Sequence, residues 1–194
     1  SPLYFFFTTT LDIKIFLNHL EKSALDYYLY FIKPHKCPDT DRKNAFTYLD
    51  AMGATRCYPL LLAGEEFLDK KDFLKLCKIT EILTFRHSTI LKRDAKVLET
   101  VFHKAIASIR KSESIDKILK IIQDQDSMKS DGQFNVAFKE YTPANHKVAR
   151  YTLFKIEETR TGKKQAKLDW GSLTLEHILA EKLDWEGKEE YLER

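Results

Sequence analysis

The sequence has few of the residues that break helices or cross-link chains: 6 glycines, 5 prolines and 3 cysteines among 194 residues. A β-sandwich needs a turn about every ten residues, so this scarcity argues against that fold class. The cysteines are odd in number and form no Cys-x-x-Cys pair, so neither a disulfide framework nor a zinc knuckle is indicated. We expect Cys37, Cys57 and Cys77 to be ordinary, semi-buried thiols in a reducing cytoplasm.

Long apolar runs and a strong charge excess are also lacking. Leu3 to Phe7 is apolar, but Asp12 and Lys14 follow closely, so the run is too short for a membrane span. It also lacks the basic start of a signal peptide. The net charge of +3 is small for a non-specific nucleic-acid binder. We expect a cytoplasmic protein without a membrane partner, and the initial Ser1 suggests a chain excised from a longer one.

The composition is that of a globular, helical protein. Hydrophobic residues make up 43% and charged residues 31% of the chain, which excludes a disordered tail. Apolar residues recur mostly at the 3-and-4 spacing of helices. The expected fold class is therefore all-α, an irregular multi-helix bundle of about seven helices, with a short strand and a helical turn at the C-terminus.

Several helices have individual signals. The first helix is expected from Leu11 to about Phe31. Acidic residues are expected to cap later helices, for example Asp94, which precedes a regular apolar stripe. The helix opened by Asp72 has little polar face between Phe73 and Phe85, so it should lie at the centre of the core. The buried face of the first helix is expected to comprise Phe16, Leu17, Leu20, Ala24, Tyr27, Tyr28 and Phe31. The other expected helix starts are Asp41, Asp72 and Thr142-Pro143.

The sequence changes character after Glu158. The segment from Thr159 to Lys167 is polar and basic, and Leu173 to Leu179 has alternating side chains typical of a short strand. We therefore place a boundary near residue 165, between a helical domain (1–165) and the start of a second unit (166–194).

Histidine is the main catalytic candidate. No two of the six histidines have the four-residue spacing of a helical zinc site, and no nucleophile elbow or phosphate-binding glycine loop is present. His87 and His103 lie in helical segments, where a partly buried structural role is expected. Glu176-His177 differs, because near a bend or strand end the imidazole could take a proton from water while the glutamate helps seat a divalent cation.

The segment around this pair resembles the entry strand of a His-Me finger (HNH) nuclease domain. The version it resembles lies at the C-terminus of GmrSD-like type IV restriction proteins, and it includes Leu173 to Leu179 and Trp185. The resemblance begins at about residue 10 and continues to the end of the chain. Its other matches, in the family's order, are 56–62 (Arg-Cys-Tyr-Pro-Leu-Leu-Leu), 84–86 (Thr-Phe-Arg), 98–102 (Leu-Glu-Thr-Val-Phe), 134–138 and 149–157.

The resemblance implies a function for the parent protein. Such proteins carry a ParB-like N-terminal nucleotide-binding domain, a helical region and the HNH unit, and they restrict foreign or modified phage DNA in bacteria. It implies that His177 is the general base of phosphodiester hydrolysis and that Glu176 takes the place of the metal-ligand acid, the metal being Mg²⁺ or Mn²⁺. The nearby basic residues would either contact DNA phosphates or form a solvated loop. They are Arg160, Lys163, Lys164 and Lys167.

Two features depart from the family pattern. Ala180 replaces the proline that usually follows the Glu-His-Ile-Leu segment. The residues after His177 are also too few for the second strand and the helix that carries the remaining asparagine or histidine ligand. We therefore expect the fragment alone to hold no cofactor and to cut no DNA. The alternative is a non-catalytic helical coupling or interaction domain with a vestigial Glu-His pair, which Ala180 favours.

Overall fold

The computed structural model describes residues 10–160, with side chains from residue 12 onward, and this part is all-α, as expected. Nine α-helices and no strand lie in this range, against about seven helices expected. The expected C-terminal strand and helical turn, and the boundary near residue 165, fall outside it. The chain divides into two compact units, Ser1–Thr142 and Pro143–Arg194.

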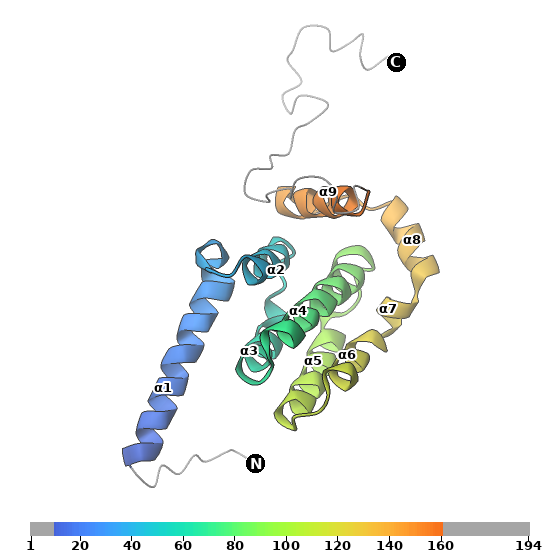
Figure 1. The fold of residues 1–194 in the computed structure, drawn as a ribbon. Coiled ribbons are helices and arrows are strands. Elements are labelled where there is room, and N and C mark those ends of the chain that lie inside the picture. Colours follow the sequence, from blue (N-terminus) through green and yellow to red (C-terminus); the bar gives the residue numbers. More distant parts are fainter. Residues whose placement is uncertain (1–9, 161–194) are drawn as a thin grey trace, which may run out of the picture. The chain divides into compact units, whose positions relative to one another are not determined.

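Eight of these helices belong to the first unit (Figure 1). They are α1 (Thr10–Tyr27), α2 (Thr40–Ala51), α3 (Tyr58–Phe67), α4 (Lys70–Thr84), α5 (Ala95–Arg110), α6 (Ile115–Gln123), α7 (Asp126–Lys129) and α8 (Asp131–Lys139). Two π-helical turns, η1 (Tyr28–Ile32) and η4 (Phe85–Ile90), follow α1 and α4, and two 3₁₀ turns, η2 (Pro34–Lys36) and η3 (Thr55–Cys57), precede α2 and α3. The second unit contributes α9 (His146–Arg160).

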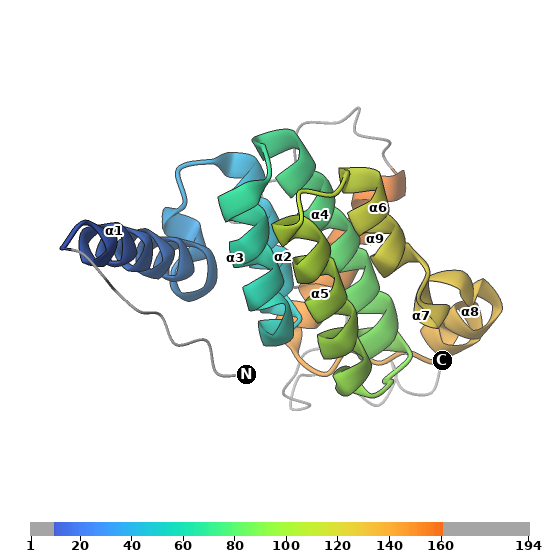
Figure 2. The same ribbon diagram turned by 90° about the horizontal axis from the view of Figure 1, so that it is seen from below.

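Helix α4 lies at the centre of the first unit, as its apolar sequence predicted. It packs against α2, α3 and α6, and α3 to α6 lie side by side (Figure 2). Phe73, Leu76 and Leu83 of α4 are 0% exposed. Burying each such side chain stabilises the fold by about 1.5–3 kcal/mol, so this helix carries much of the core.

The helix caps agree with the sequence analysis in one case and differ in others. Asp94 caps α5 as predicted, because its carboxylate accepts a hydrogen bond from the Lys96 amide at 2.9 Å. Asp72 does not cap α4. The cap is Asp69, which accepts a bond from the Asp72 amide at 2.9 Å. An N-cap side chain reaches the amides two and three positions ahead of it, so Asp72 lies in the first turn instead.

The starts of α2 and α9 show the same kind of displacement. Asp39, not Asp41, caps α2, and its carboxylate accepts a bond from the Asp41 amide at 3.1 Å. Helix α9 begins at His146, after Asn145, whose side chain accepts a bond from the Val148 amide at 3.0 Å. The expected start at Thr142-Pro143 is therefore wrong by a few residues: both Thr142 and Asn145 are of a type that can cap a helix, and here the side chain of Asn145 accepts the bond.

Of the two histidines predicted to be partly buried, one is buried and the other is exposed. His87 is 2% exposed, and its two ring nitrogens lie 3.1 Å from Ser127 Oγ and 2.9 Å from the Asp94 carbonyl oxygen. This satisfied, buried ring confirms the structural role. His103 is exposed on α5, so its expected burial is wrong.

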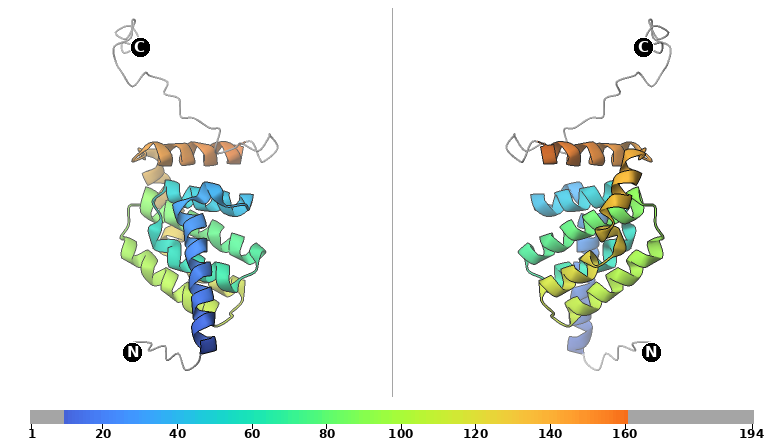
Figure 3. Two further views of the ribbon diagram at one scale, coloured as in Figure 1. Left: turned by 90° about the vertical axis from the view of Figure 1, so that its left-hand side faces the viewer. Right: turned by 90° about the vertical axis from the view of Figure 1, so that its right-hand side faces the viewer.

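The largest disagreement concerns α1. Leu17 is 53% and Leu20 is 54% exposed, whereas Phe31, at the far end of the predicted face, is 7% exposed. Helix α1 leads away from the other helices (Figure 2), and in the left view of Figure 3 it lies in front of them, with its first turns extending below. The expected burial of the face from Phe16 to Tyr28 is therefore wrong. Apolar periodicity identifies which face is apolar and does not show that this chain covers it.

Candidate functional site

The predicted catalytic and metal-binding residues, and most of the predicted phosphate contacts, lie outside the described range. This applies to Glu176 and His177 and to the lysines at 163, 164 and 167. Arg160 is described as the last residue of α9, where its Nε lies 3.2 Å from Glu157 Oε2 and its side chain is 78% exposed. A contact of Arg160 with DNA phosphate stays a prediction.

Segments that carry the family resemblance meet elsewhere in the structure. Arg56 of η3, the first residue of the 56–62 segment, donates a hydrogen bond from Nη1 to Oε1 of Glu99 on α5, in the 98–102 segment. Both side chains are about half exposed, at 48% and 45%. An exposed ion pair of this kind stabilises a protein by about 0.2–1 kcal/mol. Its main effect is therefore to fix the position of η3 against α5.

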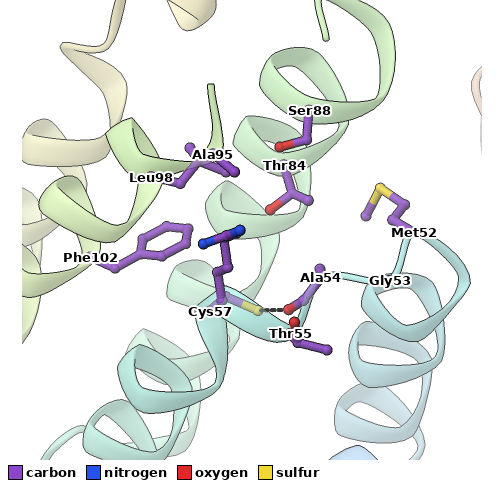
Figure 4. Close-up of a pocket in the computed structure, with 11 residues that line it drawn as sticks. Met52, Gly53, Ala54, Thr55, Cys57, Thr84, Ser88, Ala95, Leu98 and Phe102 are labelled. Carbon is purple, nitrogen blue, oxygen red and sulfur yellow. Dashed lines mark hydrogen bonds between the residues drawn. The ribbon is translucent and has the colours of Figure 1, made fainter. Parts of the chain in front are cut away.

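A cavity of about 150 Å³ adjoins this ion pair (Figure 4). Leu98 and Phe102 of α5 form an apolar wall, and the oxygen of Thr84 at the end of α4 faces the centre of the view. Thr84 belongs to the third resembling segment, 84–86. Three segments far apart in the sequence thus line one cavity.

The size and chemistry of this cavity indicate a packing junction. Pockets for small organic ligands are typically about 300–1,000 Å³, and this one is smaller. Cys57, on its wall, is 1% exposed and donates a hydrogen bond from Sγ to the Ala54 carbonyl oxygen. Burial raises the pKa of Cys57 to about 12. The thiol therefore stays protonated at neutral pH and is a poor nucleophile, while the charge of Arg56 is balanced by Glu99.

A second polar cluster joins the end of α1 to α2 and α3. Arg42 Nη2 donates a 2.8 Å hydrogen bond to Glu65 Oε1, and the Arg42 guanidinium lies 5.5 Å from the centre of the Phe73 ring. Burial raises the pKa of Glu65, which the Arg42 charge opposes. Burial also raises the pKa of Tyr30, as does the nearby Glu65 carboxylate. Removing Arg42 would leave a mostly buried carboxylate uncompensated, so this pair should be structurally important.

Sequence reasoning missed both ion pairs. Arg42 and Glu65 are 23 positions apart, and Arg56 and Glu99 are 43 apart. No local pattern links residues at such separations. The only available signal was that Arg56 and Glu99 each lie in a segment resembling the same family.

The described part of the chain shows no metal site: between residues 10 and 160, no group of three or more His, Cys, Asp or Glu side chains could hold an ion. The cation that the resemblance places beside Glu176 falls outside this range. No helix in the range is long and apolar enough to cross a membrane.

Comparisons with protein-family models, with curated proteins and with solved structures gave no match to this chain.

Proposed function

We propose that this chain is part of a bacterial metal-dependent DNA endonuclease of the GmrSD-like restriction type. It would supply the helical region and the first strand of the HNH unit. The observation that carries the proposal is the segment Leu173 to Leu179, which places Glu176-His177 in an alternating apolar context, with Trp185 downstream. The substrate class is foreign or modified DNA.

The proposed reaction is hydrolysis of a phosphodiester bond. The imidazole of His177 accepts a proton from water as the water oxygen attacks phosphorus, and the bond from phosphorus to the leaving oxygen breaks. Glu176 would help to hold Mg²⁺ or Mn²⁺, which when bound supplies positive charge beside the phosphate and the leaving oxygen. Nucleotide would act only through a ParB-like domain N-terminal to these residues.

The described helices are compatible with this proposal. The segments 56–62, 84–86 and 98–102, which were matched by sequence alone, line a single cavity beside the Arg56–Glu99 pair. This packing is what a single helical region of such a protein would require.

The test is plasmid nicking by the intact protein that contains this chain, with Mg²⁺ or Mn²⁺, with and without nucleotide, on modified and unmodified DNA. Because loss of a general base typically costs about 10²–10⁴ in rate, His177→Ala should reduce cleavage at least a hundredfold. His35→Ala is the matched control, because His35 is exposed on η2 and outside both polar clusters. The 194-residue chain alone should not cut. Cleavage by the intact protein that His177→Ala leaves unchanged would refute the assignment.

Ala180 favours a second candidate, a non-catalytic helical domain that couples a nucleotide or modified-base signal to a nuclease or a partner chain. The family's proline makes a rigid turn behind the base, and alanine does not. This candidate predicts that the intact protein has no cleavage activity of its own. An asparagine-bearing helix within a few dozen residues downstream in the gene would instead favour the nuclease.

A further inference from the structure

Helix α1 presents an apolar surface that the described part of the chain leaves open. Ile13, Leu17 and Leu20 are 44%, 53% and 54% exposed. Within the described residues the helix meets the rest of its unit near its end, where the Tyr27 ring lies 5.9 Å from the Tyr58 ring, and at His19, whose Nδ1 lies 3.5 Å from Glu66 Oε1. Most of the stability of a protein helix comes from packing of its amphipathic face. A partner that covered this face would therefore stabilise α1, which has 18 residues.

The apolar residues of α1 follow a heptad. With Leu17 assigned to position a, the a and d positions of α1 run from Ile13 to Tyr27, and the next a position, Phe31, lies in the π-helical turn η1. Other exposed apolar residues fall outside this seam, namely Ile15 (f), Phe16 (g), Leu25 (b) and Tyr28 (e). The seam consists of Ile13 (d), Leu17 (a), Leu20 (d), Ala24 (a), Tyr27 (d) and Phe31 (a). A coiled-coil seam of this kind fits another helix of similar length.

The charges beside the seam favour a second copy of the same helix in antiparallel orientation. Antiparallel coiled coils pair a with d positions and e with e positions. In the register that puts Leu17 against Leu20 of the other copy, Lys14 (e) faces Glu21 (e), and by symmetry this pair forms twice. A parallel pair would instead place Glu21 beside Phe16 (g). Within residues 10–160 no ion pair engages Lys14 or Glu21.

We propose that α1 is a self-association surface on which two copies of this chain pair their α1 helices antiparallel, with Leu17 against the partner's Leu20 and Lys14 against the partner's Glu21. A membrane surface fits less well. Helices that bind membranes carry a basic polar face, whereas the polar positions of α1 include Asp12, Glu21 and Asp26 as well as Lys14 and Lys22.

The test is sedimentation velocity of the 194-residue chain over a wide concentration range. The mass should rise from 22.8 kDa toward twice that value as concentration increases. Each exposed ion pair is worth about 0.2–1 kcal/mol and two are lost, so Lys14→Glu should weaken the dimer about tenfold. Glu21→Lys should do the same, and the double swap should restore wild-type affinity within about threefold. Lys22→Glu makes the same charge change at position f and should have no effect.

Cysteine cross-linking tests the orientation, since the three natural cysteines are buried. In the antiparallel register Ile13 faces Ala24 of the other copy. A mixture of Ile13→Cys and Ala24→Cys chains should therefore form mixed disulfides, and Ile13→Cys alone should not. Circular dichroism should show unchanged helix content, because every substituted side chain is on the exposed part of α1.

Four results of the sedimentation and cross-linking experiments would overturn the proposal. They are a chain that is monomeric at all concentrations, a Lys22→Glu effect equal to that of Lys14→Glu, a double swap that fails to restore pairing, and disulfide formation by Ile13→Cys alone. Binding of the wild-type chain to phosphatidylcholine vesicles without self-association would assign the surface to lipid instead and would equally refute it.

Discussion

Replacing Gly64 with alanine has two opposing effects on stability, a gain in helix propensity and a loss from overpacking. Gly64 lies within α3, where Gly→Ala normally stabilises a helix by about 0.5–1 kcal/mol. A Cβ at this position would lie 2.7 Å from Leu76 Cδ2 and 3.1 Å from Phe73 Cδ2. Both neighbours are 0% exposed on α4, so neither can move into open space. Overpacking of a core costs about 1–3 kcal/mol, so we expect Gly64→Ala to lower the free energy of unfolding by about 1 kcal/mol.

Gly132→Ala provides a control with the same chemical change. Gly132 lies in the first turn of α8, and a Cβ there has no atom within 4 Å. Only the helix preference operates, so this variant should gain about 0.5 kcal/mol. In thermal unfolding, about 1 kcal/mol corresponds to about 2–4 °C for a chain of 150–250 residues. The two midpoints should therefore move in opposite directions.

An increase in the midpoint of Gly64→Ala, similar to that of Gly132→Ala, would refute this reasoning. It would mean that α3 and α4 can separate by a few tenths of an ångström at little cost. Gly64 would then not be required for the close packing of α3 on α4.

Three further predictions concern single side chains. Thr84 Oγ1 is buried without a hydrogen-bond partner in the described residues, so Thr84→Val should leave the free energy of unfolding unchanged or raise it by up to about 1 kcal/mol. Thr152→Val is the control, because it removes a 2.9 Å hydrogen bond to the Val148 carbonyl oxygen and should lower the free energy of unfolding by about 1 kcal/mol. Urea unfolding measures both variants. Hydrogen bonds from Lys70 and the Arg42 amide hold the pKa of Asp39 below its usual 3.8. The ionised Asp39 carboxylate therefore contributes its full stabilisation of the fold above pH 3.8, and this contribution is lost as the pH falls through the lowered pKa. In unfolding curves measured over a pH series, Asp39→Asn should lose less stability in acid than the wild type does. The raised pKa of Cys57 and the burial of its thiol predict that Ellman's reagent reacts with it at pH 8 only after unfolding.

The sequence predicted those features of the fold that depend on neighbouring residues. The position of α4 at the centre followed from its near-absence of a polar face, and the Asp94 cap followed from one acidic residue before an apolar stripe. The caps of α2 and α4 were misplaced because each helix start has two acidic residues. One serves as cap, and the other favours the first turn through the helix dipole. Sequence spacing alone does not distinguish the two roles.

The sequence indicated the segments that form the candidate site but did not indicate that they lie together. Arg56, Thr84 and Phe102 each lay in a segment that resembled one family, but nothing local indicated that they share one cavity. Their convergence depends on how η3 and the end of α4 pack against α5. The approach of α3 to α4 at Gly64 likewise depends on tertiary packing and has no local signal.

The apolar faces of α4 and α1 were predicted by the same rule and had different outcomes. In α4 the expected burial was correct, because α2, α3 and α6 cover the helix. In α1 the rule identified the correct apolar positions, but no element in the described range covers Leu17 and Leu20. Such a face is costly to leave in water, and exposed apolar surfaces of this kind often mark contacts between molecules. The failure of the burial prediction at α1 is therefore itself an argument for intermolecular contact, which the Lys14 and Lys22 charge reversals can test.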